Sequence, residues 1–356
     1  MIERENYLAV KAFLKFQGEV MQRDPATILT ERGWLKHLLR WADDTPLPGA
    51  ANLRPVFPQY LLTVNRGDGH GGRLSALGVE SGCEYARMFF EWARLSLKAY
   101  RKIDPLWIRT IRPPRMAGEP RKEHQAVTLD TVRALLAVPV AEGDVATWRD
   151  KAAAAFLFLS GARSGAFCTL TLDCVNLAEK TITQYPTLGV RTKNKKAAVT
   201  ALLAIPDLLD MVGEWDSFIR GKLPTTAPWY SVIRIKLGEQ VLTADKPGKH
   251  RGIVLRDNMV KLFVKAELPP MSPHKFRHGH AVYGLKAARD MSDLKAVSMN
   301  LMHANIGTTD AIYAVLSDRD MQARIAGLGE GGRQVKQDDV EELLRAALDM
   351  LKVRKW

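Results

Sequence analysis

The chain has 356 residues, of which 46% are hydrophobic and 26% charged, a balance that excludes a disordered chain and favours a globular protein of two domains. The most apolar run, Ala152 to Leu159, is far shorter than the ~20 residues that span a bilayer, so we expect no membrane-spanning helix. The formal net charge of +13 favours a polyanionic partner, most often nucleic acid, although a solvated basic surface would carry the same charge.

The first 112 residues are predicted to form a helical domain. One set of apolar residues recurs at the three- and four-residue spacing of a buried helix face: Trp34, Leu35, Leu38 and Trp41. The stretch from Pro46 to Gly49 then ends that helix.

A later helix is predicted from about Glu84 to Lys102, and its apolar stripe consists of Ala86, Phe90, Ala93, Leu97 and Tyr100. Four basic residues fall on a second face beside that stripe: Arg87, Arg94, Lys98 and Arg101. Such a face suits a DNA backbone and equally suits water, so the sequence leaves both interpretations open.

A linker is predicted at residues 113–126, between this domain and the next. The stretch from Arg112 to Lys122 reads RPPRMAGEPRK, and proline fixes the backbone and cannot donate a hydrogen bond. Arg112 and Arg115 are candidate DNA contacts in this stretch. A new helix is predicted to begin after Thr128 as its N-cap, which places a second domain at residues 127–328.

The second domain is predicted to contain helices up to about Ser160, a few short strands, and then mostly helix to Leu328. The β-prone runs lie near Thr181–Tyr185, Gly189–Lys193 and Ala198–Ala204. The clearest later helices are Arg277–Lys286 and Asp293–Met302. Residues 329–356 are predicted to form a tail, because apolar residues recur at helical spacing from Gln334 onward.

Two motifs admit other chemistry. Gly67 to Gly72 (GDGHGG) has the letters of a dinucleotide fingerprint but lacks a preceding strand, so a loop is favoured. His274 and His278 share a helix face on which zinc could bind with His303 as a third ligand, but Arg277 on the same turn would repel a cation. We therefore expect neither a metal nor a cofactor.

The three cysteines, Cys83, Cys168 and Cys174, contain no Cys-x-x-Cys pair and are expected to be small buried residues in a reducing cytoplasm.

Four segments supply, in order, the groups that phosphoryl transfer needs. These are guanidinium groups that form paired hydrogen bonds to the phosphate oxygens, a nucleophile and a proton donor. The four segments are Gly161-Ala-Arg163, Thr192-Lys193-Asn-Lys195-Lys196, His274-x-x-Arg277-His278, and His303 followed by Tyr313.

The chain resembles the tyrosine recombinase (phage integrase) family in the order of these arginine, lysine, histidine and tyrosine residues. It also resembles the family in the sequence around them, such as SPHKFRH and LMH…TT…Y. The resemblance covers about Thr128 to Ser317 and extends more loosely to the N-terminal helices. It implies a mainly α-helical protein with a small antiparallel β-sheet, in which residues 1–112 are a helical core-binding DNA clamp and residues 127–328 a mixed α/β catalytic domain.

The resemblance also implies the chemistry: site-specific cutting and rejoining of DNA strands through a 3′-phosphotyrosyl intermediate. Tyr313 would be the nucleophile, Arg163 and Arg277 would hold the phosphate, and His274 and His303 would bond to it or manage the nucleophile's proton. Lys193 would protonate the leaving oxygen, with Lys195 and Lys196 as contacts to DNA. No metal and no cofactor would be needed.

The expected partner is double-stranded DNA, bound by a homo-tetramer on paired sites and by a monomer or weak dimer when free. The expected location is cytoplasmic and nucleoid-associated, in a prokaryotic or phage-encoded protein. A type IB topoisomerase-like enzyme and a non-catalytic DNA-binding protein of the same fold are the alternatives. The chain departs from the family at Ala166, where an acid is usual, and at Met302, where a glycine usually precedes the second histidine.

Overall fold

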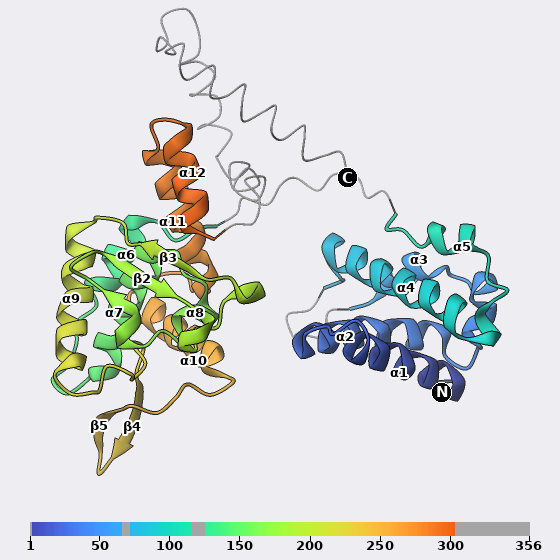
Figure 1. Ribbon diagram of the computed structural model, residues 1–356, viewed down its shortest axis with the longest axis horizontal. Helices are drawn as coiled ribbons and strands as arrows, with labels where there is room; N and C mark the ends of the chain where they lie inside the picture. Colours follow the sequence, from blue (N-terminus) through green and yellow to red (C-terminus); the bar gives the residue numbers. More distant parts are fainter. Residues whose placement is uncertain (1, 66–71, 115–124, 303–356) are drawn as a thin grey trace, which may run out of the picture. The chain divides into compact units, whose positions relative to one another are not determined.

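The computed structural model (Figure 1) describes residues 2–65, 72–114 and 125–302. The chain divides into two compact units, Met1–Lys122 and Glu123–Trp356, and the division falls within the predicted linker. No helix in the described ranges is long and apolar enough to cross a bilayer.

The regular secondary structure in the described residues of the first unit is helical, apart from an isolated β-bridge between Asn65 and Arg73. Its elements are α1 (Arg4–Glu19), α2 (Pro25–Ala42), the 3₁₀ turn η1 (Leu47–Asn52), α3 (Phe57–Thr63), α4 (Ala76–Ser96), the 3₁₀ turn η2 (Lys98–Tyr100) and α5 (Pro105–Thr110). Aromatic rings fill its core, and Phe89 packs edge-on against Phe13, Phe90 and Tyr100. The predicted helix around Trp34 to Trp41 is confirmed within α2.

The helix predicted from Glu84 to Lys102 has different ends. It begins at Ala76, where the Ser75 hydroxyl caps the amide of Gly78, and it ends at Ser96 because Leu97 adopts an extended backbone. Arg87 and Arg94 therefore lie on α4, whereas Lys98 and Arg101 lie in and after the separate turn η2. The prediction that all four share one helix face is wrong.

The second unit surrounds one buried helix, α7 (Val145–Ser160), with α6 (Leu129–Leu136), α9 (Pro206–Arg220), α10 (Arg251–Lys265) and α11 (Pro273–Ala287) packed against it. Every residue of α7 from Ala152 to Ser160 is buried, which explains the run of apolar residues there. The N-cap predicted for α6 is confirmed, since the Thr128 hydroxyl accepts a hydrogen bond from the amide of Thr131 at 3.1 Å.

A three-stranded antiparallel sheet has the order β1 (Val175–Asn176), β2 (Thr181–Gln184), β3 (Ala198–Ala201). Figure 1 shows β2 and β3 side by side among the helices of this unit. In the register of β2 and β3, Thr181 lies opposite Ala201 and Gln184 opposite Ala198. Among the described strands β3 pairs with β2 alone, so one of its edges faces away from this sheet. The fold class expected from the sequence is confirmed.

A second hairpin, β4 (Val232–Lys236) and β5 (Glu239–Thr243), was not expected in a region predicted to be mostly helical. Its turn consists of Leu237 and Gly238, both at positive φ (51° and 86°), as a two-residue hairpin turn requires.

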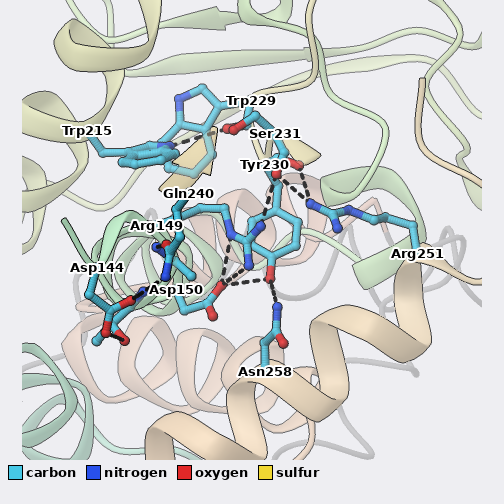
Figure 2. A network of polar contacts seen from close by, with 12 residues as sticks. Asp144, Arg149, Asp150, Trp215, Trp229, Tyr230, Ser231, Gln240, Arg251 and Asn258 are labelled. Carbon is cyan, nitrogen blue, oxygen red and sulfur yellow. Dashed lines mark hydrogen bonds and ion pairs between the residues drawn. The ribbon is translucent and has the colours of Figure 1, made fainter. Parts of the chain in front are cut away.

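Figure 2 shows a buried polar network that fixes α7 to the segment after α9. The ring of Tyr230 lies between two guanidinium groups, with Arg149 at 4.3 Å and Arg251 at 4.4 Å from its centroid. Its hydroxyl donates to Asp150 at 2.7 Å and accepts from Asn258 at 2.9 Å. These hydrogen bonds and cation–π contacts fix the positions of α7, α10 and the segment around Tyr230 relative to one another.

Candidate active site

Arg163 stands directly beyond the end of the buried helix α7. Gly161 ends that helix with φ +59°, and Arg163 immediately precedes the short helix α8 (Ser164–Phe167). A Cβ at position 161 would lie 2.7 Å from Leu301 and 2.8 Å from His280, so both the backbone conformation and the space require glycine. Arg163 is half-buried, and loss of solvation lowers its pKa.

Arg277 lies in α11 and is buried, with 7% of its surface exposed. Its Nη1 donates to the carbonyl of Gly161 at 2.7 Å, and its Nη2 donates to the carbonyl of Leu301. The side chain thus joins the end of α7 to the segment after α12 (Met291–Asn300). Burial first, and then the charge of Arg163, lower the pKa of Arg277 to about 9, which leaves it protonated at neutral pH.

His274 occupies the first turn of the same helix. Loss of solvation around its ring, followed by the positive charges of Arg277, Lys275 and Arg163, lowers its pKa, although the residue keeps contact with solvent. Its ring packs edge-on against that of His278, with centroids 4.5 Å apart.

No carboxylate within the described ranges forms an ion pair with either arginine, and position 166 holds the buried Ala166. Two arginines whose charges act on each other without a counter-ion form a site suited to an anion. The described residues contain no group of three or more side chains that could hold a metal ion.

The prediction of a strand at Gly189–Lys193 is wrong. After β2 the chain forms the 3₁₀ turn η4 (Pro186–Leu188), turns at Gly189 with φ +83°, and forms a second turn η5 (Lys193–Lys195) before β3. The amide of Arg191 donates to the Thr169 hydroxyl at 2.9 Å and not to a neighbouring strand. Valine and threonine favour strands, but this glycine and the left-handed Asn194 prevent one here.

The three candidate lysines therefore lie at the connection between β2 and β3. Lys193 and Lys195 are exposed, whereas Lys196 is half-buried and its Nζ donates to the carbonyl of Met302 at 3.4 Å. The β2–β3 connection thus reaches the end of α12, beside the last described residues.

The end of α12 is held by several contacts. The side chain of Asn300 bonds to both main-chain groups of Ala201: its Oδ1 accepts from the amide at 2.7 Å and its Nδ2 donates to the carbonyl at 3.0 Å. Its Nδ2 also lies 3.5 Å from Nε2 of the buried His280. Met302 follows with φ +53°, a conformation that glycine adopts most easily. This conformation gives a physical reason why the tyrosine recombinase family usually has a glycine at the position of Met302.

His280 and Asn300 are not among the site residues predicted from the sequence. The Nδ1 of His280 lies 2.8 Å from the carbonyl of Phe158 and so carries the proton, and burial lowers the pKa of His280 to about 4. His280 is in α11, one turn beyond Arg277, and this shared helix face is the signal that the sequence offered for it.

The structure brings Arg163, His274 and Arg277 together and places Lys193 on the β2–β3 connection. His303, Tyr313 and Arg115, the Gly67–Gly71 part of the glycine-rich motif and the tail 329–356 lie outside the described residues. Among the candidate DNA contacts of the first unit, Arg87 and Arg94 are half-buried and Lys98, Arg101 and Arg112 are exposed. The expectation that Cys83, Cys168 and Cys174 are free and buried is confirmed.

Comparisons with known proteins identify the family and similar folds. The model of the phage integrase family matches residues 125–319. A fragment of the Tn1549 transposon integrase, solved in complex with circular intermediate DNA, is 15% identical with a TM-score of 0.56, and the match covers 91% of this chain and 99% of that one. A fragment of lambda integrase, solved as a dimer bound to a COC′ core site, is 14% identical with a TM-score of 0.58, covering 88% and 96%. At these identities the likeness concerns the fold. No curated protein matches the chain.

Proposed function

Because this chain belongs to the phage integrase family and is a site-specific recombinase, we propose that Tyr313 is its nucleophile and that the cationic site around Arg163 and Arg277 binds the scissile phosphate. The observation that carries the proposal is the pair of arginines, one between α7 and α8 and the other in α11, with no carboxylate counter-ion within the described ranges. A phosphodiester group supplies the missing negative charge, and guanidinium groups stabilise the charge that develops on it.

In the proposed reaction the Tyr313 oxygen forms a bond to the phosphorus and the bond to the 5′ oxygen breaks. Lys193 gives a proton to that leaving oxygen, and His274 or His303 receives the proton of the phenol. The neutral form of His274, favoured by its lowered pKa, is the form able to accept a proton. The 5′ hydroxyl of a second strand then reverses these steps, and since each step exchanges one phosphodiester bond for another, no energy-rich cosubstrate is required.

We further propose the assembly. Double-stranded DNA is the partner, residues 1–112 act as a clamp on it, and residues 127–328 carry the chemistry, as in the family. Four protomers would act on two paired sites, with residues 329–356 contributing protomer contacts. The net charge of +13 suits binding to many phosphates.

The nucleophile is tested by covalent trapping. A nicked duplex that carries the chain's own site, selected by binding from a random pool, should yield a protein–DNA adduct on a denaturing gel. Tyr313→Phe should bind this duplex with unchanged affinity and give no adduct. The matched control is Tyr283→Phe, which should still give the adduct. Tyr283 is half-buried and its ring packs against that of Phe158, with the centroids 5.9 Å apart. An adduct from Tyr313→Phe would refute the assignment.

The proton donor is tested with a substrate in which sulfur replaces the bridging 5′ oxygen, since a thiolate leaves without protonation. Lys193→Ala should cleave the ordinary site ~10²–10⁴-fold more slowly and the sulfur site at nearly the normal rate. Rescue of Lys195→Ala or Lys196→Ala, with no rescue of Lys193→Ala, would move the role to another lysine of the turn.

A further inference from the structure

The side chain of Asn300 occupies the free edge of the three-stranded sheet. Thr181 lies opposite Ala201 on the β2 side, while on the other side Asn300 takes both main-chain groups of Ala201. A carboxamide has a hydrogen-bond donor and an acceptor side by side. It can therefore pair with both main-chain groups of one residue in an edge strand, as a neighbouring strand would.

This contact joins the two parts of the chain that the proposed reaction must bring together. Ala201 ends β3, which begins at Ala198, shortly after the turn η5 that carries Lys193. Asn300 ends α12, and Met302 leads from it toward His303. The Asn300 Nδ2 also lies 3.5 Å from Nε2 of His280, and Arg277 donates to the carbonyl of Leu301, so the same end of α12 is fixed against the arginine site.

We propose that Asn300 is a positioning residue: it fixes the segment leading to His303 and Tyr313 relative to the β2–β3 connection, and so aligns the nucleophile with the leaving oxygen. This inference rests on the proposed function. A misplacement of about 1 Å in such an alignment costs on the order of 10²-fold in rate. The cost should fall on the chemical step, because the side-chain hydrogen bonds of Asn300 to described residues go to Ala201 and His280, and neither is a proposed DNA contact.

Asn300→Asp tests the inference with almost no change in size. The carboxylate still accepts from the Ala201 amide, but its second oxygen faces the Ala201 carbonyl and the unprotonated Nε2 of His280, both of which are acceptors. Single-turnover cleavage of the nicked duplex at saturating protein should fall ~10²-fold. The protein concentration for half-saturation should change less than about twofold, and the melting temperature of the protein should fall by at most a few degrees.

The matched control is Met299→Ala, which changes the neighbouring residue of α12, 67% exposed, and should leave cleavage and binding unchanged. A second variant, Ala201→Pro, removes the donor to Asn300 without removing a hydrogen bond to β2, because the amide of Ala201 faces away from β2. If one contact carries the effect, the double variant should cleave no more slowly than the slower single variant.

The sulfur-bridged substrate separates this role from that of Lys193. Asn300→Asp should remain slow on it, since delivery of the nucleophile is the affected step. Wild-type cleavage by Asn300→Asp, or a parallel loss of binding and thermal stability, would overturn the inference. If Tyr313→Phe still forms an adduct, the proposed function fails first; if it forms none and Asn300→Asp cleaves normally, only the inference fails.

Discussion

Arg163 and Arg277 have the same expected role in the sequence, but replacing each with alanine should have different effects on stability. Arg277 donates to two main-chain carbonyls, those of Gly161 and Leu301, and is buried. Arg163 is half-buried, and its guanidinium raises the electrostatic cost of burying Arg277. One arginine therefore supports the fold, and the other opposes it slightly.

The size of the difference follows from these contacts. Arg277→Ala leaves two carbonyls without their donor, at about 1–3 kcal/mol each, partly offset because a buried charge is removed. We expect the free energy of unfolding to fall by about 2–5 kcal/mol. Arg163→Ala should change it by less than about 1 kcal/mol, in the stabilising direction, while cleavage falls ~10²–10³-fold.

The assay is urea unfolding of the full chain, followed by hydrogen exchange in peptides from α7 and α11, with single-turnover cleavage measured in parallel. Arg277→Lys keeps the charge and one possible donor, so it should lose less stability than Arg277→Ala. Equal unfolding free energies for Arg163→Ala and Arg277→Ala would refute the reasoning, because Arg277 would then have no structural role.

Two further predictions concern the support of this site. Gly279→Ala should destabilise the second unit by more than about 3 kcal/mol, measured by urea unfolding, because its Cβ would clash with the carbonyl oxygen of Val127. Gly213→Ala, with open space around it, is the control and should be neutral or stabilising. His280 has a pKa of about 4 in the folded chain against an ordinary value of 6.5, so the unfolded chain binds the proton of His280 more tightly. The contribution of neutral His280 to the free energy of unfolding should therefore be complete above about pH 6.5 and be lost as the pH falls toward 4. The total loss should be roughly 3 kcal/mol. His280→Gln should show a smaller loss over this range, and an identical pH dependence would contradict the prediction.

Patterns confined to a few neighbouring residues predicted much of the fold. The α2 stripe and the Thr128 cap depend on spacings within one helix, and both are confirmed. The ends of α4 were misplaced because the periodicity of Ala86 to Tyr100 continues past Leu97, where the backbone becomes extended. Periodicity describes which side chains are buried and not where helical hydrogen bonds stop.

The errors in the β-structure have a similar cause. Gly189–Lys193 has the composition of a strand, but a strand needs a partner, and Arg191 bonds to Thr169 instead. The β4–β5 hairpin was missed because its turn uses Leu237, a residue that does not usually adopt positive φ.

The site was predicted only in part, because some of its contacts join distant residues. Arg163, His274 and Arg277 belong to short motifs that can be read locally. His280 bonds to a carbonyl 122 residues away and Asn300 to a strand 99 residues away, so neither neighbourhood reveals the contact. A single sequence contains no measure of such distances.

The two kinds of proposed catalytic group lie in surroundings that differ in how tightly they are packed. Arg163 extends from the end of α7, whose last turns are buried on every side, whereas Lys193 stands in an exposed turn with two consecutive left-handed residues, Asn194 and Lys195. Substitutions near the arginine must preserve the volume of a close-packed core, but the turn can change in length and composition at little cost. Divergence or laboratory selection for faster or slower recombination should therefore proceed mainly through the turn, which in the proposed mechanism would change proton delivery while the arginine site stays constant.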